Sequence, residues 1–112
     1  MEGLMLTEVY EIGTYHVIKI NEILHLTSNI DELLSIIDNL LKKNVKNIAI
    51  SFQDNSYLYS KTGSVIVRCW EKIQDQNGNL ALINTNEDIR DFLAVIDIEF
   101  LIKKVSTEEE LL

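Results

Sequence analysis

The sequence predicts an α/β domain in which about four helices pack on a mixed, mainly parallel sheet. Apolar runs of strand length alternate along the chain with segments in which apolar residues recur at helical spacing. This alternation is typical of layered domains with parallel inner strands, because a parallel connection needs a crossover of helix length. With 112 residues, 46% of them hydrophobic, the chain is expected to form one domain over 1–112 with its own core.

The N-terminal part predicts a β-hairpin. Two strand-like segments, 5–11 and 14–20, flank a turn at Ile12-Gly13. Because the strands of a hairpin run antiparallel, this pair would make the sheet mixed. A short extended piece is expected to follow at 22–26.

The first helix has the clearest signal in the chain. Ser28 with Asp31 forms a capping-box-like start, and Lys42 and Lys43 complement the negative end of the helix dipole. The strand expected next, 46–52, is apolar enough to be buried on both faces. The helical repeat consists of Ile30, Leu33, Leu34, Ile37, Leu40 and Leu41.

A second helix is expected over 61–76, where it would end at Asn77-Gly78. Its buried stripe would consist of Val65, Ile66, Cys69, Trp70 and Ile73. The rest of the chain predicts a strand at 80–83 and a third helix that starts near the Thr85-x-x-Asp88 cap. A strand at about 100–105 and a short helix opened by Ser106 with Glu109 are expected to follow.

The charge and the cysteine content of the chain indicate which kinds of partner and which compartment to expect. A net charge of −8 without a dense basic run argues against nucleic acid or an anionic membrane surface as the partner, and suits a protein with a basic face. No apolar run approaches the roughly 18 residues of a membrane span, and the acidic N-terminus lacks the basic region of a signal peptide. The single Cys69 fits a reducing compartment, so we expect a cytoplasmic protein.

The loop after the strand at 46–52 is the best candidate for a functional site. It concentrates hydroxyl groups and two tyrosines directly before a helix. In open α/β sheets, ligands gather at the carboxyl ends of the strands, which is where this loop would lie. The residues concerned are Ser56, Tyr57, Tyr59, Ser60 and Thr62.

The order of elements and this loop resemble the STAS family, the anti-sigma factor antagonists. Family members have a strand of the type I-V-L-N-L, a loop S-F-M-D-S-S-G-L-G, a helix and a Gly-Gly turn. Here 48–52 align with the strand, Ser56-Tyr57-Leu58 with S-F-M, and Gly78 with the turn. Upstream, Glu22, Ile23 and Thr27 match the family's G-E-L-D…T segment, and 100–111 is similar to its final strand and S-x-x-E-A-L helix.

The departures from the family loop concern its phosphorylation. The aligned aspartate is Tyr59, the first serine is Ser60, and the second serine, the one that family kinases phosphorylate, is Lys61. The two glycines of D-S-S-G-L-G are Thr62 and Ser64. Lys61 cannot accept a phosphoryl group, and its charge opposes the helix dipole unless the side chain reaches away.

Two hydroxyls near Lys61 are the candidate phospho-acceptors. Ser60 is either a displaced acceptor or simply the helix N-cap, a common role for serine. Thr62 becomes the acceptor if the alignment shifts by one residue, which needs an insertion and a compensating deletion. Tyr57 either covers the core edge or contacts a partner, whereas the contact interpretation is favoured for Tyr59.

The resemblance implies a non-enzymatic regulatory module in signalling and transcription regulation. It would dock an anti-sigma factor or a serine kinase through the 55–66 loop and the following helix, with Tyr57, Tyr59, Ser60, Lys61, Thr62 and Ser64 in contact. The alternative is a constitutive scaffold or self-associating subunit, for example a homodimer, without a phospho-switch. A hydrolase or transferase using Ser60 is disfavoured because no histidine and acid partners are evident. No cofactor or metal is expected, since His16 and His25 lack zinc-ligand spacing.

Overall fold

The computed structural model describes residues 7–24, 29–54, 56, 58 and 60–112. Within these ranges the chain forms a five-stranded sheet whose strands follow one another in sequence order, β1-β2-β3-β4-β5. Strand β1 pairs antiparallel with β2, and all other pairs are parallel, so the predicted mixed sheet is confirmed. The strands are β1 (Thr7–Ile12), β2 (Tyr15–Ile20), β3 (Asn47–Ser51), β4 (Asn79–Ile83) and β5 (Lys103–Val105).

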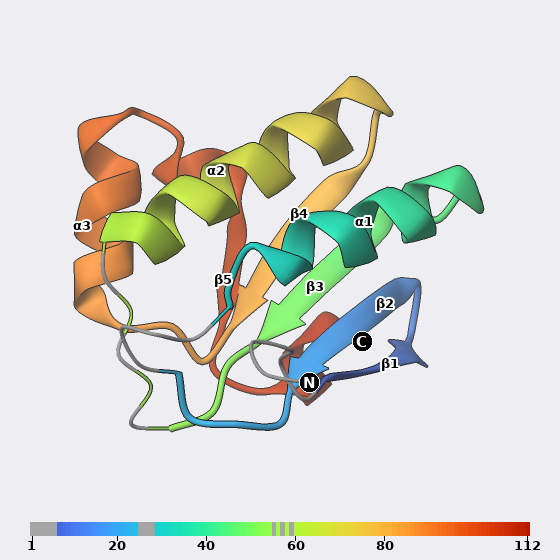
Figure 1. Cartoon of the computed structure of the whole chain (residues 1–112), viewed down its shortest axis with the longest axis horizontal. Helices are drawn as coiled ribbons and strands as arrows, with labels where there is room; N and C mark the ends of the chain where they lie inside the picture. Colours follow the sequence, from blue (N-terminus) through green and yellow to red (C-terminus); the bar gives the residue numbers. More distant parts are fainter. Residues whose placement is uncertain (1–6, 25–28, 55, 57, 59) are drawn as a thin grey trace.

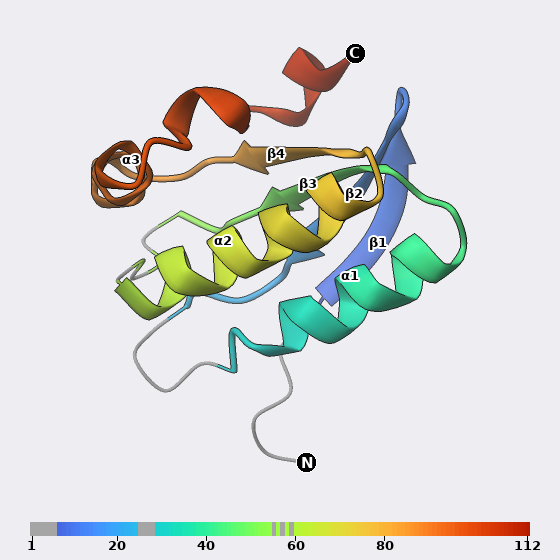
Figure 2. The same cartoon turned by 90° about the horizontal axis from the view of Figure 1, so that it is seen from above.

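The sequential strand order decides where the helices lie. The described ranges hold α1 (Glu32–Lys42), α2 (Ser60–Asp75) and α3 (Glu87–Val95), each of which joins two neighbouring parallel strands. Such crossovers are almost always right-handed, so connections that all step in the same direction put their helices on the same face. Figure 2 shows α1 and α2 on one side of the sheet and the C-terminal segment on the other, with α3 at one end.

The register of the strands separates large from small side chains. Ile18, Ile50 and Leu82 lie side by side on the helix face and belong to the main core. One residue earlier, Val17, Ala49 and Ala81 form the matching row on the opposite face. All of them are buried, which confirms that β3 is an inner strand. The small side chains suit a face that is covered only by a thin segment of chain.

The C-terminal segment provides that cover. The 3-10 helix η2 (Glu108–Leu111) inserts Leu111, which is 6% exposed, against Val17, Ala49 and Ala81. The Tyr10 hydroxyl on β1 donates a hydrogen bond to the Glu108 carboxylate. Burial and this hydrogen bond raise the pKa of Tyr10, because a buried phenolate is poorly solvated and could no longer donate a hydrogen bond to the Glu108 carboxylate.

The end of the chain corrects three predictions. There are three α-helices in the described ranges rather than about four, since the last element is a single 3-10 turn. Its capping box pairs Thr107 with Glu110, not Ser106 with Glu109. The strand predicted at 100–105 begins only at Lys103, because 99–101 form the 3-10 turn η1 (Glu99–Leu101).

Other boundaries also differ from the predictions. The hairpin turn lies at Gly13-Thr14, one residue later than predicted, with Gly13 at a left-handed φ of 58°. Helix α1 begins after Asp31, later than a start at Ser28 would give, and Ser28 itself lies outside the described residues. The cap of α3 is Asn86 instead of Thr85, and its side chain accepts a hydrogen bond from the Ile89 amide. The described part of the piece predicted at 22–26 forms no strand.

All three α-helices end in the same hydrogen-bond pattern. After α3, the amide of Ile98 donates to the Leu93 carbonyl and that of Asp97 to Ala94, both at 3.1 Å. This is a Schellman motif, in which the residue after the cap adopts a left-handed conformation. Glycine usually fills that position, but here it is occupied by Asn44, Asn77 and Asp97, with φ values of 64°, 59° and 60°.

Helix α3 packs against the start of α2 through a glycine. A Cβ at Gly63 would lie 2.7 to 2.9 Å from ring carbons of Phe92, closer than carbon atoms can approach. The absence of a side chain at Gly63 therefore lets the Phe92 ring lie directly on the α2 backbone. Figure 1 shows the first turns of α2 beside α3 at one end of the molecule.

Replacing Asp97 by glycine is expected to stabilise the fold by about 0.5–1 kcal/mol. A left-handed residue with a Cβ costs about 1–2 kcal/mol, which the greater entropy of glycine in the unfolded chain offsets in part. Urea unfolding would measure this difference. The control Ala94→Gly, inside α3, is expected to lower stability by up to about 1 kcal/mol. A lower stability of Asp97→Gly would show that the left-handed backbone of Asp97 does not cost free energy in the native protein.

Gly63→Ala is expected to lower the free energy of unfolding by about 1–2 kcal/mol, since the new methyl group must displace the Phe92 ring. In a Phe92→Ala background the same change is expected to be neutral or stabilising, because alanine favours helix over glycine by up to about 1 kcal/mol. Urea unfolding of the four proteins gives the coupling directly. An equal cost in both backgrounds would show that Phe92 is not the reason for Gly63.

Candidate protein-binding site

The predicted site lies at the carboxyl end of β3, where the chain leaves the sheet and enters α2. Two apolar side chains anchor this connection in the main core: Phe52 and Leu58 are each 3% exposed. The amide of Phe52 still donates to the Ile83 carbonyl of β4, at 3.1 Å. The connection is therefore held at its start and again shortly before the helix.

Neighbouring strand ends fix the connection further. The Asn84 side-chain amide donates to the Phe52 carbonyl at 2.9 Å and to the Asp54 carboxylate at 2.8 Å. On the other side, the Ser56 hydroxyl accepts a hydrogen bond from the Leu24 amide at 2.9 Å. Asn84 follows β4 and Leu24 follows β2, so both strands next to β3 hold its loop. These contacts hold Phe52, Asp54 and Ser56 in place at the carboxyl end of the sheet.

The first turns of α2 divide the predicted contact residues into two groups. Ser60, Lys61 and Ser64 are exposed, whereas Thr62 is only 1% exposed and faces the core. Gly63 is also buried, under the Phe92 ring. The exposed group includes two small side chains, which leave the α2 backbone open to close approach by a partner. Tyr57 and Tyr59 lie outside the described residues.

Lys61 reaches away from the helix start. Its ammonium group lies 3.0 Å from the Asp31 carboxylate, at the residue that caps α1. This reduces the expected conflict between a lysine and the positive end of the α2 dipole, because the Asp31 carboxylate pairs with the ammonium group. Both side chains are about half exposed, so the pair adds at most about 1 kcal/mol to stability.

Helix α2 begins at Ser60, one residue before the predicted start. The Ser60 hydroxyl is thus in the first turn and exposed to solvent. The amide groups of a first helical turn have no partners within the helix, and they attract anions. Of the two candidate acceptors, Ser60 is accessible to an enzyme and Thr62 is enclosed.

Three residues that shape this site were not predicted: Asp31, Asn84 and Phe92. Asn84 directly follows the apolar run of β4, and polar residues after neighbouring parallel strands meet at one edge of the sheet. That position was a usable signal. The contacts of Asp31 and Phe92 depend on how α1 and α3 lie against α2, which no local pattern reveals.

Other reactive groups in the described ranges suggest no chemistry. No three His, Cys, Asp or Glu side chains there are grouped as around a metal ion. Cys69 is fully buried, and burial raises the pKa of its thiol to about 12, so it is the inert core thiol that its place on the apolar stripe predicts. No helix among these residues combines the length and apolarity needed to cross a membrane.

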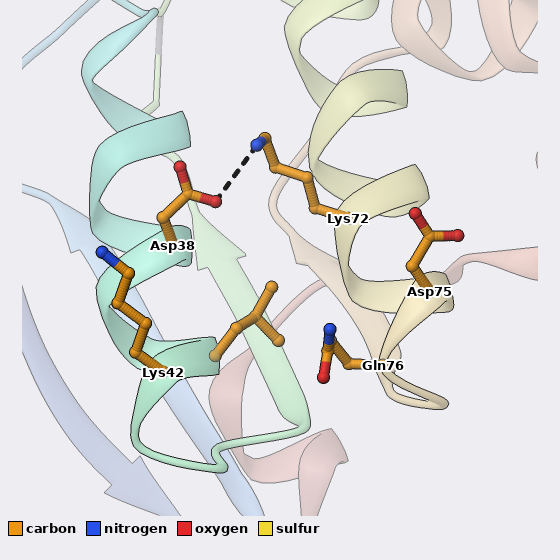
Figure 3. Close-up of a pocket in the computed structure, with 6 residues that line it drawn as sticks. Asp38, Lys42, Lys72, Asp75 and Gln76 are labelled. Carbon is orange, nitrogen blue, oxygen red and sulfur yellow. Dashed lines mark hydrogen bonds and ion pairs between the residues drawn. The ribbon is translucent and has the colours of Figure 1, made fainter.

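A hollow of about 390 Å³ lies between the second halves of α1 and α2 (Figure 3), whereas Ser60 is the first residue of α2. An ion pair between Asp38 and Lys72, at 3.1 Å, spans the two helices. The remaining lining residues are Leu41, Lys42, Asp75 and Gln76. Charges of both signs alternate around the hollow, which gives it no preference for a cation or an anion.

The sequence matches no protein-family model and no curated protein, whereas its fold matches solved structures. One is the crystal structure of TM1081 from Thermotoga maritima, assigned as an anti-sigma factor antagonist, with a TM-score of 0.72 and 20% identity over 94% of this chain and 90% of that one. An NMR structure of TM1081 gives a TM-score of 0.68 and 20% identity over 98% and 88% of the chains.

A third match is the Bacillus cell-fate determinant SpoIIAA in its phosphorylated form, with a TM-score of 0.72 and 13% identity. The match covers 95% of this chain and 96% of SpoIIAA, so it includes nearly every element of both folds. The resemblance inferred from the loop and the order of elements is confirmed at the level of the fold: the chain has the STAS-like fold of these structures.

Proposed function

We propose that this protein is a non-enzymatic regulatory module of the cytoplasm that docks a protein partner through residues 55–66 and the rest of α2. The partner class is an anti-sigma factor or a switch kinase, as the names of the structural relatives suggest. The observation that supports this most is the first turn of α2, where Ser60, Lys61 and Ser64 are exposed above a buried Thr62 and Gly63.

The physical properties of this surface suit docking. Phe52, Asp54 and Ser56 are hydrogen-bonded to residues that follow the two neighbouring strands, which lowers the conformational entropy that these three residues would lose on binding. Lys61 and Asp31 present a half-exposed charge pair that a partner can recognise at the edge of its interface. Tyr57 and Tyr59 would add the aromatic area that protein interfaces favour.

A phospho-switch at this surface would use Ser60. A phosphoryl group there would bring a charge of about −1.5 to −2 to the start of α2, beside Lys61. The positive end of the α2 dipole would stabilise an anion at that place. The same charge would oppose a partner surface that fits a neutral hydroxyl. Thr62 would have to leave the core before a kinase could reach it.

The alternative is a constitutive scaffold or self-associating subunit, such as a homodimer, that docks without a switch. The Lys61–Asp31 pair favours it, because a permanent contact between two helix starts occupies the position of the family's phosphorylated serine. Both functions use the same surface. They differ in whether Ser60 is modified.

Lys61→Glu is expected to weaken binding of a purified anti-sigma factor from the same organism by about tenfold, which is about 1.4 kcal/mol. The new carboxylate would face Asp31 as well as the partner, while stability should change by less than about 1 kcal/mol. Isothermal titration calorimetry measures the affinity and urea unfolding the stability. Tyr59→Ala is the companion variant and is expected to weaken binding similarly.

The matched control restores the ion pair with its charges exchanged, in the double variant Asp31→Lys/Lys61→Glu. If the partner recognises the charge at position 61, binding stays weak although the two helix starts are again paired. Recovery of full affinity would mean that only the geometry of the pair matters. Wild-type affinity in both Lys61→Glu and Tyr59→Ala would rule out this surface as the docking site.

Phosphorylation separates the switch from the scaffold. After incubation with the cognate serine kinase and ATP, mass spectrometry of the intact protein is expected to show one added phosphate on wild type and none on Ser60→Ala. Thr62→Ala should still be modified, because Thr62 is buried. Absence of phosphate at saturating kinase would favour the constitutive scaffold.

A further inference from the structure

The end of α3 and the η1 turn expose four large apolar side chains. Phe100 is 96% exposed, Val95 82%, Leu101 60% and Ile96 41%, and α3 and η1 are in contact. We call these four residues the α3–η1 patch. With about 200 Å² for an aromatic and about 100 Å² for an aliphatic side chain, the patch exposes on the order of 400 Å². A standard interface buries about 800 Å² per partner, a little over half of it apolar, which is close to the summed exposed area of these four side chains.

The backbone beneath the patch is fixed by specific contacts. Ile98, at 9% exposure, points into the core and donates its amide to the Leu93 carbonyl in the Schellman motif. The Lys104 ammonium group donates to the carbonyl of Glu99 and, at 3.0 Å, to that of Ile102. Leu101 closes the η1 turn by donating to the Ile98 carbonyl at 3.0 Å. The patch is therefore presented by an ordered scaffold, which lowers the entropy lost on binding.

Acidic groups border the patch. Asp88 and Asp91 precede Val95 on α3 at helical spacing, so the three share one face of the helix. Asp97 adjoins Ile96, and Glu99 adjoins Phe100. The basic groups nearby are fewer, namely Arg90, Lys103 and Lys104, and the ammonium group of Lys104 is turned toward backbone carbonyls. A second copy of this chain, with a net charge of −8, would bring like charges against this border.

We propose that the α3–η1 patch is a second docking surface, for a protein that offers an apolar groove bordered by lysine or arginine. Phe100 would fill the groove and Val95, Ile96 and Leu101 would surround it, while Asp91 and Asp97 meet the basic border. This surface does not depend on the α2 site or on a phosphate. Either proposal can fail without the other.

Photocrosslinking identifies the occupant. In its own cells, the full chain would have Phe100 replaced by p-benzoylphenylalanine, and irradiation followed by mass spectrometry names the crosslinked protein. With that protein purified, Phe100→Ser is expected to weaken binding at least 30-fold and Asp91→Lys about tenfold. Raising NaCl from about 50 to 500 mM should weaken wild-type binding about tenfold, as screening of opposite charges requires.

Leu112→Ser is the matched control. Leu112 is 82% exposed, and the C-terminus lies far from α3 in both views of the molecule (Figures 1 and 2), so its loss should change affinity less than twofold. Since both side chains are nearly free of the core, both variants should keep the wild-type melting temperature.

Four results would overturn the proposal. The first is the absence of any crosslink. The second is a crosslink to a second copy alone, together with dimers in sedimentation equilibrium that Phe100→Ser abolishes. The third is unchanged affinity in Phe100→Ser. The fourth is binding that strengthens with salt, which would exclude a basic border on the partner.

Discussion

The whole molecule depends on the burial of β3 on both faces of the sheet. Its side chains are large on the face that the helices cover and small on the opposite face. Ile48 and Ile50 face the helices, and Ala49 faces the C-terminal segment. Because every parallel connection steps in one direction along the sheet, the helices cannot be shared between the two faces. The second face must then be covered by the C-terminal segment. The small side chains of Val17, Ala49 and Ala81 suit this cover, because the short η2 turn brings only one leucine, Leu111, against them.

The same constraint creates the candidate site. β3 has a parallel neighbour on each side, so its carboxyl end lies between the ends of β2 and β4. Asn84 and Leu24 lie just beyond those ends, and their hydrogen bonds hold the loop that β3 sends to α2. The core then fixes the start of α2 from below, through Thr62 and Gly63. Because Thr62 and Gly63 face the core, the part of the α2 start that remains accessible is its outer face, with Ser60, Lys61 and Ser64.

Periodicity was enough to predict most of this architecture. The order of strands and helices, the antiparallel hairpin and the burial of β3 all followed from apolar spacing, because burial on one or two faces leaves a direct record in the sequence. The exact caps did not follow. Asn86 stands next to Thr85, and Thr107 next to Ser106, and each pair offers two side chains with the same capping chemistry, so only the backbone geometry selects one.

The error at Phe100 is more informative than the errors at the caps. Phe100-Leu101-Ile102 has the composition of a buried strand, yet only Ile102 is buried. The Schellman motif at Asp97 turns the chain sharply, and η1 follows before the chain enters β5. Phe100 and Leu101 therefore lie in a turn and not in a strand. Tertiary geometry overrode local preference there and left an aromatic ring in solvent. Composition cannot distinguish a residue that is apolar for the core from one that is apolar for a partner.

The two surfaces differ in the physics that each offers to a partner. At the start of α2, small and polar groups surround a balanced charge pair, a surface on which a single added phosphate would change the local charge substantially. At the end of α3, a larger apolar area stands within an acidic border, where affinity would come from burial and selectivity from charge. The Phe92–Gly63 contact joins the helices that bear these two surfaces, so neither helix can shift without disturbing the other. The two proposed docking surfaces thus lie on one core, the first built from small and polar groups and the second from apolar side chains.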